Sequence, residues 1–399
     1  MTQGMTQDKR TGLIHHPYVP PDGFEAVAPG VHKASTVIFP NVAALQARNW
    51  RSKTGYTYGL HGTPTSFTLE ERIATLEGGV QTLLVPSGLA SITLVDMALL
   101  KQGDEVLIPE NAYGPNKELA RNELAAWGIT HRFYDPMDAL GLAALISPQT
   151  RLLWLEAAGS VTMEFPNLPA LVKVAREHGI TTALDNTWGA GVAFNPFDLT
   201  PDTEPLGVDI SVQALTKYAS GGGDVLMGAV TTRDEALHLK LKFCHMRMGW
   251  GVGANDIELV LRSLPSLHLR YDAHDTAART LAAWWSQRRE VIQVLHPALP
   301  GAPGHECWKK LCTRAAGLFS VVFNERYAPE QVHAFLDALR LFKLGYSWAG
   351  PVSLAVPYNL AVMREEPAYR GVLVRFSVGL EAPADLIADC QQALHALGP

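Results

Sequence analysis

Short apolar runs alternate with amphipathic stretches between about residue 69 and residue 233. The runs are almost continuously hydrophobic, which is typical of strands buried on both faces of a parallel sheet. The stretches between them, such as Asn116–Trp127 and Leu168–His178, repeat apolar residues at helical spacing. Seven strands are predicted: Gln81–Val85, Glu105–Pro109, Thr130–Tyr134, Arg151–Leu155, Thr181–Leu184, Ile210–Gln213 and Leu226–Thr231. The alternation predicts an α/β fold whose mostly parallel, seven-stranded sheet is covered by helices on both faces.

Two regions of different character flank this segment. Residues 1–62 are rich in Pro, Gly and aromatic side chains, with few periodic apolar runs, which is typical of an extended arm that packs on a neighbouring chain. A long amphipathic helix, Ser266–Arg288, leads into further strands and helices, including Leu318–Phe323 and Gly371–Ser377. The sequence therefore predicts three parts: an arm (1–62), a larger sheet domain (63–262) and a smaller α/β C-terminal domain (263–399).

Composition narrows the class of protein. The 399 residues are 47% hydrophobic and 18% charged, which excludes intrinsic disorder and coiled coil. The formal net charge is −6, so we expect neither nucleic acid nor an acidic membrane as a partner. We find no apolar run long enough to span a membrane and no signal-peptide core. The four cysteines lack disulfide or zinc spacing, and the histidines lack metal-ligand spacing, so we expect a cytoplasmic protein without a metal site.

Candidate chemistry lies at the strand ends, where α/β sheets bind their ligands. The first strand runs into the small-residue turn Ser87-Gly88-Leu89, which opens a helix and offers backbone N–H groups to a phosphate. An ordinary serine N-cap is the alternative. The second strand leads to Tyr113, which either stacks on a ligand or is a simple loop tyrosine.

Two charged residues follow later strands. Asp185 directly follows Thr181–Leu184, where a buried carboxylate needs a cation or a protonated ring nitrogen, unless it only caps the next loop. Lys217 follows Ile210–Gln213 and precedes three glycines, a setting in which an amine has a lowered pKa and forms a Schiff base with a carbonyl. Each signal is weak alone. Together, a phosphate turn, an aromatic ring, an aspartate and a lysine are what pyridoxal phosphate requires.

Longer motifs extend these signals along nearly the whole chain, from about Leu13 to the C-terminus. They are Tyr58-Gly59 with Gly62-Thr63-Pro64-Thr65, Pro86-Ser87-Gly88, Leu184-Asp185-Asn186-Thr187, Gln213-Ala214-Leu215-Thr216-Lys217-Tyr218, Gly345-Tyr346-Ser347-Trp348-Ala349-Gly350 and Arg375-Phe376-Ser377-Val378-Gly379-Leu380-Glu381. Together they resemble the Cys/Met-metabolism family of pyridoxal phosphate-dependent enzymes, fold type I. The resemblance implies an aspartate aminotransferase-like fold, pyridoxal 5'-phosphate as cofactor, and a homotetramer built from dimers with shared active sites.

The resemblance also implies roles for individual residues. Lys217 is the cofactor-bearing lysine and catalytic base, and Asp185, with Thr187 beside it, is the partner of the ring nitrogen. Tyr113 stacks on the cofactor, borders the substrate and assists deprotonation of the substrate amine. The residues implied to bind the phosphate are Ser87, Gly88, Leu89 and Thr216, together with Tyr58 from a neighbouring subunit, which also borders the substrate.

Arg375 is the one charge in the apolar run Val372–Phe376. An unpaired guanidinium there is costly, so it either forms a structural salt bridge or binds a substrate carboxylate bidentately. The resemblance implies the second role, with Ser347 and Trp348 beside the carboxylate.

Within the family the chain is most similar to the cystathionine β-lyases of methionine biosynthesis. This implies cleavage of cystathionine to homocysteine, pyruvate and ammonia, and action on cystine and other cysteine S-conjugates. Tyr346, Trp348 and Ala214 favour the β-lyase type over cystathionine γ-synthase and γ-lyase, which remain the alternatives within the family. A non-catalytic ligand-sensing module is the alternative from another class, although the chain offers no basic DNA-binding extension.

One position departs from the family pattern. Related enzymes usually carry an arginine two residues after the tyrosine that matches Tyr58, and this arginine pairs with the cofactor phosphate. Here the sequence reads Leu60 and then His61. Either the helix N-terminus, Thr216 and Tyr58 hold the phosphate without it, or His61 or a distant arginine takes its place.

Overall fold

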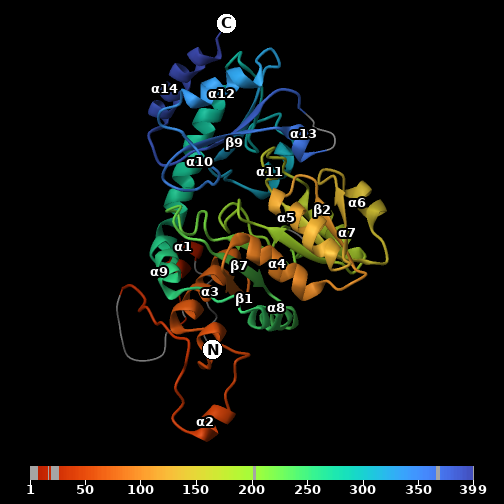
Figure 1. Cartoon of the computed structure of the whole chain (residues 1–399), viewed down its shortest axis with the longest axis vertical. Coiled ribbons are helices and arrows are strands. Elements are labelled where there is room, and N and C mark those ends of the chain that lie inside the picture. The colour runs from red at the N-terminus through yellow and green to blue at the C-terminus, as the bar shows by residue number, and fades with distance from the viewer. Residues whose placement is uncertain (1–7, 17, 19–26, 201–203, 365–368, 399) are drawn as a thin grey trace.

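The computed structural model describes residues 8–16, 18, 27–200, 204–364 and 369–398. Figure 1 shows two sheet regions along the long axis of the molecule. The helices α10, α12 and α14 lie at one end of this axis, and the segment that contains α2 projects at the other end. The candidate site residues come from both sheet regions, so the site depends on how these two regions meet.

The larger sheet has seven strands in the order β1-β7-β6-β5-β4-β2-β3. Its strands are β1 (Gln81–Val85), β2 (Glu105–Pro109), β3 (Thr130–Tyr134), β4 (Thr150–Glu156), β5 (Thr181–Asp185), β6 (Ile210–Ala214) and β7 (Gly228–Thr232). All neighbours are parallel except β7, which runs antiparallel to both β1 and β6. The predicted mostly parallel, seven-stranded sheet is therefore confirmed. β7 follows β6 through residues 215–227, which contain no helix to cross the sheet, and the two strands pair antiparallel.

Helices cover both faces of this sheet, as predicted. They are α3 (Pro64–Glu77), α4 (Gly88–Leu99), α5 (Gly114–Leu119), the π-helical turn η2 (Ala120–Leu124), α6 (Ala139–Leu145), α7 (Leu168–Glu177), α8 (Glu235–Met248) and α9 (Ala254–Ser263). Alternate residues of β4 enter different cores: Leu153 packs with residues of α3, α6 and α7, whereas Trp154 packs with residues of α4 and α8. The predicted helix Asn116–Trp127 begins earlier, at Gly114, and contains the π-helical turn.

The C-terminal sheet has five strands in the order β10-β11-β12-β9-β8, antiparallel except for β10 and β11. Its strands are β8 (Val291–Leu295), β9 (Leu318–Phe323), β10 (Lys343–Leu344), β11 (Leu354–Tyr358) and β12 (Leu373–Ser377). The accompanying helices are η3 (Leu264–Ser266), α10 (Leu267–Trp285), α11 (His305–Leu311), α12 (Pro329–Asp337), α13 (Leu360–Met363), α14 (Pro383–Ala393) and η4 (Leu394–Leu397). Trp285 of α10 is fully buried against Phe376 of β12, which fixes the helix on this sheet.

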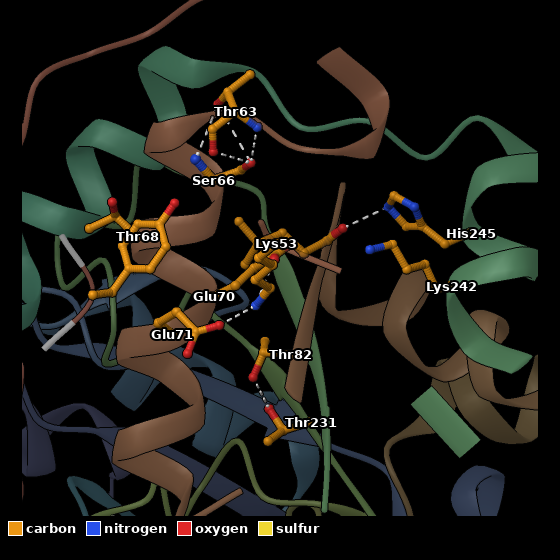
Figure 2. Close-up of polar contacts among 12 residues, drawn as sticks. Lys53, Thr63, Ser66, Thr68, Glu70, Glu71, Thr82, Thr231, Lys242 and His245 are labelled. Carbon is orange, nitrogen blue, oxygen red and sulfur yellow. Dashed lines mark hydrogen bonds and ion pairs between the residues drawn. The ribbon is translucent and has the colours of Figure 1, made fainter. Parts of the chain in front are cut away.

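The N-terminal segment contains α1 (Lys9–Ile14), α2 (Val42–Gln46) and the short helix η1 (Gly59–His61). Figure 2 shows how its later part is held on its own chain. Lys53 Nζ lies 3.1 Å from Glu70 Oε2 and 2.6 Å from Glu71 Oε1, both on α3. Because this ion cluster is mostly shielded from water, it fixes residues near Lys53 more firmly than an exposed pair does. In the described residues, we find no helix long and apolar enough to cross a membrane.

Candidate active site

Lys217 lies in the turn after β6, at the edge where the parallel strands end. Its Nζ donates a hydrogen bond to Ser347 Oγ at 2.7 Å and lies 5.4 Å from the ring centroid of Trp348. Burial lowers the pKa of Lys217 to about 8, and the positive charge of Arg375 acts in the same direction while Asp185 opposes it. The amine is therefore far more available as a base and nucleophile than a solvated lysine.

The loop that carries Ser347 and Trp348 comes from the C-terminal sheet region. Ser347 has a φ of 137° and Ala349 a φ of 66°, conformations that non-glycine residues rarely adopt. Glu381 holds the end of this loop, since its two carboxylate oxygens accept from the N–H and Oγ of Ser353, each at 2.8 Å. Such strain costs about 1–3 kcal/mol per residue and persists only where surrounding contacts enforce it. Here it places Ser347 against the lysine.

Asp185 ends β5, one strand away from Lys217. Its Oδ1 accepts from the N–H of Thr187 at 3.0 Å and from Thr187 Oγ1 at 2.6 Å. The same hydroxyl accepts from the N–H of Ala214 at 2.9 Å, so Thr187 joins the ends of β5 and β6. Burial raises the pKa of Asp185 despite the two bonds from Thr187. A desolvated carboxylate of this kind is stabilised by a protonated ring nitrogen.

Two other motif residues have a structural task. Asn186 donates to both carboxylate oxygens of Glu77 on α3, at 3.1 and 3.3 Å, and Gln213 and Ser211 donate to the same carboxylate. Glu77 is almost completely buried. This network joins β6 and the residue after β5 to α3. It therefore fixes the positions of the two strands whose ends carry Asp185 and Lys217.

Glu156 is a site residue that the sequence analysis missed. It ends β4 and is the register partner of Asp185 on β5. Its Oε2 accepts from the N–H of Tyr113 at 2.7 Å. Burial, and then the charge of Asp185, raise the pKa of Glu156 well above its ordinary value. The signal that singled out Asp185, a carboxylate directly after an apolar strand, was equally present here.

Tyr113 precedes α5 and leaves its side chain 43% exposed. Its phenol lies between the two sheet regions: burial raises its pKa, Asp185 and Glu156 add to the rise, and Arg375 opposes it. The phenol is consequently protonated at neutral pH. A protonated, accessible ring suits stacking, whereas the raised pKa disfavours the further role of deprotonating a substrate amine.

Arg375 lies in the middle of β12 and is only 8% exposed. Its Nη2 donates to the carbonyl of Ser347 at 3.4 Å, and its guanidinium lies 5.3 Å from the ring centroid of Tyr358. Within the described residues it pairs with no carboxylate, and its buried Nε has no hydrogen-bond partner. The structural salt bridge considered above is thus not formed there. The vacant donor fits the carboxylate of a ligand.

The turn predicted to bind a phosphate contains the serine N-cap that was its alternative interpretation, and phosphate binding stays a prediction. Ser87 Oγ caps α4 by accepting from the N–H of Ala90 at 3.0 Å, which leaves the first-turn amides of Gly88 and Leu89 in the position where helices bind anions. A Cβ on Gly88 would lie 2.5 Å from the Cβ of Ala214, so only glycine allows α4 to approach the end of β6 this closely. Thr216 Oγ1 donates to the carbonyl of Met227 at 3.3 Å and accepts from its N–H at 3.2 Å, within its own loop.

The arm residues are not brought to these groups within one chain. Tyr58 is 45% exposed and bridges to Thr36, and its ring centroid lies 5.8 Å from that of His61. His61 Nδ1 shares a hydrogen bond with Thr57 Oγ1 at 2.8 Å. Burial lowers the pKa of His61, and Lys242 and His245 add to the effect. These contacts are all with its own chain, so the predicted contribution to a neighbouring site stays a prediction.

The chemistry of these groups fits pyridoxal 5'-phosphate. A lysine with a lowered pKa, a desolvated aspartate and an accessible tyrosine accompany the first turn of α4, where the Ser87 cap takes the amide of Ala90 and not those of Gly88 and Leu89. The unpartnered Arg375 Nε is available to a second, acidic ligand. No group of three or more metal-ligating side chains occurs in the part of the chain that the structure describes.

Comparisons with known proteins agree with this description. The family model for Cys/Met metabolism PLP-dependent enzymes matches residues 10–395. A putative cystathionine beta-lyase of Rhizobium johnstonii is 38% identical over 391 residues, 97% of this chain and 96% of that protein. An L-alanine/L-glutamate racemase of Wolbachia pipientis is 35% identical and covers 92% of each chain. The crystal structure of metB from Corynebacterium glutamicum has a TM-score of 0.87 at 29% identity, and the match covers 98% of this chain and 99% of that one.

Proposed function

The chain belongs to the Cys/Met metabolism family of PLP-dependent enzymes, and from this premise we propose that it is a β-eliminating carbon–sulfur lyase. Its cofactor is pyridoxal 5'-phosphate. The proposed reaction cleaves L-cystathionine to homocysteine, pyruvate and ammonia, and extends to cystine and other cysteine S-conjugates. Relatives named cystathionine beta-lyase support this choice, among them one from Bordetella avium that is 38% identical over 392 residues.

One observation carries the proposal: Ser347 is hydrogen-bonded both to Lys217, the proposed base, and to Arg375, the proposed carboxylate-binding residue. Lys217 Nζ donates to Ser347 Oγ at 2.7 Å, and Arg375 Nη2 donates to the carbonyl of Ser347 at 3.4 Å. An α-amino acid whose carboxylate is bound by Arg375 would thus have its Cα near the amine of Lys217. This arrangement supports proton removal at Cα, the step that all eliminations from amino acids share.

The protein residues then have defined tasks. Bound pyridoxal phosphate withdraws electrons from Cα of the amino acid. Arg375 holds the α-carboxylate through its unpartnered Nε, and Asp185 keeps the ring nitrogen protonated. Lys217 takes the Cα proton at Nζ and returns it to the departing sulfur, which its pKa of about 8 permits in both directions. Tyr113, with its accessible phenol, would hold the cofactor ring by stacking.

The test is a pyruvate assay on cystathionine, cystine and a panel of S-substituted cysteines. We expect pyruvate from the wild type, and Lys217→Ala to lose both turnover and the long-wavelength absorbance of lysine-bound cofactor. Turnover and absorbance that survive in Lys217→Ala would disprove the assignment. Lys173→Ala, which removes an exposed lysine on α7 far from the site in the fold, is the matched control and retains both turnover and absorbance.

The γ-acting enzymes are distinguished by the keto acid. Ala214, against which Gly88 packs, and the aromatic pair Tyr346 and Trp348 support the β type. Formation of 2-oxobutyrate from cystathionine, in place of pyruvate, would identify a γ-lyase. Replacement of an activated homoserine ester by cysteine would identify a γ-synthase.

Racemisation is a second candidate, favoured by the relative named L-alanine/L-glutamate racemase. The same removal of the Cα proton by Lys217 precedes both outcomes. Alanine has no leaving group on Cβ, so the proton must return to Cα. Chiral analysis of L-alanine and L-glutamate incubated with the enzyme detects racemisation. If pyruvate is released from cystathionine and no D-amino acid forms, only the lyase activity is supported.

We also infer that the active site is completed by a second copy of the chain in a homotetramer. Residues near Tyr58 support this, because Ile38 is 91% exposed and Val42 66% exposed on the projecting segment, an apolar surface suited to burial against another subunit. All four cysteines are free thiols, which supports the proposed cytoplasmic location.

A further inference from the structure

A buried ion pair joins the two sheet regions beside the candidate site. Arg364 directly follows α13, and Glu164 lies between β4 and α7. Arg364 Nη1 donates to Glu164 Oε1 at 2.8 Å and Nη2 to Oε2 at 3.3 Å, with side-chain exposures of 12% and 9%. Nη2 also donates to Thr162 Oγ1. A two-point pair shielded from water fixes the orientation of both partners.

Lys117 of α5 makes a second connection between the same regions. Its Nζ donates to the carbonyl of Glu110 at 3.0 Å and to the carbonyl of Met363 at 2.9 Å. Lys117 is only 7% exposed, and burial lowers its pKa, with Arg364 among the smaller contributors. The buried ammonium therefore holds the start of the 110–113 loop against the end of α13.

The Arg364–Glu164 ion pair also contacts the 110–113 loop, through the side-chain amide of Asn111. Asn111 Nδ2 donates to Glu164 Oε2 at 3.3 Å, and the carbonyl of Asn111 accepts from the N–H of Ser160 at 2.8 Å. Tyr113 follows two residues later. On its other side this loop is held where Glu156 accepts the N–H of Tyr113 at 2.7 Å and where the carbonyl of Tyr134 accepts the N–H of Glu110 at 2.9 Å.

The same C-terminal segment is tied to Arg375. α13 follows β11, which pairs along its length with β12, and Val356 of β11 is the register partner of Arg375. Tyr358, the last residue of β11, lies under the guanidinium of Arg375. Arg364 is therefore a short chain segment away from the groups that surround the carboxylate anchor.

We propose that Arg364 is a positioning residue: through Glu164 and Asn111 it sets the place of Tyr113 relative to Arg375. This inference deepens the proposed function and rests on it for the tasks of Tyr113 and Arg375. The buried pair contacts neither the lysine nor the phosphate turn among the described residues, so its effect on the reaction is confined to how the loop and the anchor are aligned.

The test compares two ion pairs of the same chemistry. Arg132 donates to both oxygens of Glu105 at 2.8 Å, but this pair joins β3 to the first residue of β2, at the opposite end of that strand from the 110–113 loop. We expect Arg364→Gln in the holoenzyme to raise KM for cystathionine about tenfold with a much smaller change in kcat, since misplacement of a positioned group lowers kcat/KM by up to about 100-fold. Amide exchange of residues 110–117 becomes faster in this variant. Arg132→Gln changes neither quantity.

Two further variants separate positioning from general stability. Arg364→Lys keeps the positive charge but cannot bind both oxygens of Glu164 as a guanidinium does. We therefore expect its KM to lie between those of the wild type and Arg364→Gln. Glu164→Gln, which keeps the shape of the side chain, gives the same KM and exchange phenotype and replaces Arg364→Gln if that variant does not fold. In the double variant the effects are not additive, because either change already breaks the pair.

Equal KM and equal loop exchange in Arg364→Gln and Arg132→Gln would overturn the inference. The exchange measurement also separates it from the proposed function. If the wild type releases no pyruvate, the proposed reaction is wrong, while faster exchange confined to residues 110–117 in Arg364→Gln still supports the coupling of loop and ion pair. Unchanged exchange in an active Arg364→Gln variant contradicts the coupling alone.

Discussion

The amine of Lys217 is tuned by two charged residues of opposite sign. Burial and Arg375 lower its pKa to about 8 from an ordinary value of 10.5, and Asp185 partly opposes them. Only the unprotonated amine attacks a carbonyl, so the rate at which the apoenzyme binds pyridoxal phosphate covalently should rise with pH through about 8. Removing the positive charge in Arg375→Leu moves the midpoint to higher pH, and Asp185→Asn moves it to lower pH. Stopped-flow absorbance measures these midpoints, and identical midpoints in all three proteins would contradict the account.

Glu156 supports Tyr113 through one hydrogen bond. Its Oε2 accepts the Tyr113 N–H at 2.7 Å, and burial and then the charge of Asp185 raise the pKa of the carboxyl well above its ordinary value, which favours the neutral form. Glu156→Gln keeps an acceptor oxygen on a neutral side chain, so we expect kcat/KM close to that of the wild type. Glu156→Ala loses one hydrogen bond, about 1 kcal/mol or roughly fivefold in kcat/KM. A larger loss in Glu156→Gln than in Glu156→Ala would show that the carboxyl must ionise.

Single site residues could be predicted from the sequence where a charged side chain lies in or directly after an apolar strand. Lys217, Asp185 and Arg375 each stood out as a charge against an apolar run. Burial lowers the pKa of Lys217 and Arg375 and raises that of Asp185. Glu156 follows the same rule but was overlooked because no motif drew attention to it. Arg364 and Glu164 were out of reach, since their pairing joins residues 200 positions apart and depends on tertiary geometry.

If α4 binds the cofactor phosphate as proposed, its first turn is the element on which cofactor binding should depend most directly. Its N-terminus approaches β6 so closely that a Cβ on Gly88 would lie 2.5 Å from that of Ala214. We expect Gly88→Ala to displace the helix end and weaken binding of pyridoxal phosphate by about 5- to 150-fold, since overpacking of this kind costs about 1–3 kcal/mol. Gly253→Ala is the matched control, because Gly253 also begins a helix but has nothing within 4 Å of the added Cβ. Fluorescence titration of the apoenzyme measures both, and equal affinities would mean that α4 does not bind the phosphate.

The strands were predicted well because each is a short apolar run that burial on both faces demands. Their order and direction were harder, since a hydrophobic run does not encode its partner. The reversal of β7 depends on the loop after Lys217, whose glycine Gly221 has a φ of 66° and lies against Arg270 of α10. Similarly, the helix predicted over Asn116–Trp127 is real, but its π-helical turn leaves no signature in the apolar spacing.

At the scale of the whole molecule, the site is proposed to need two chains. Lys217→Ala and Tyr58→Phe are each expected to be strongly impaired alone. When the two proteins are mixed and exchange subunits, hybrid dimers contain one site with both residues intact, so activity returns toward about a quarter of the wild-type value by random pairing, with two shared sites per dimer. Subunit exchange is verified independently with differently tagged chains. Failure to complement despite exchange would show that Tyr58 serves its own chain or no site at all.

The arm also poses the question of what neutralises the cofactor phosphate. Leu60 replaces the arginine of related enzymes and packs near Gly251, where an added Cβ would lie 3.3 Å from its side chain. His61 is the nearest substitute, but burial and the charges of Lys242 and His245 lower its pKa in the isolated chain. A neutral imidazole binds a phosphate dianion weakly, and the phosphate of a neighbouring subunit would in turn raise the pKa.

The sign of the pH dependence follows from this competition. If His61 contributes, only its protonated form attracts the phosphate, so cofactor retention is greatest at low pH and falls as pH rises through the bound-state pKa. His61→Ala should abolish this dependence, and Leu60→Arg should slow cofactor loss at every pH, because a guanidinium stays charged throughout the range and pairs with phosphate bidentately. The half-time of cofactor loss during gel filtration at several pH values between about 6 and 8.5 brackets the unperturbed histidine pKa of about 6.5 and provides the measurement. If neither variant differs from the wild type, this stretch does not touch the phosphate, and Gly88, Leu89 and Thr216 must hold it without help from the arm.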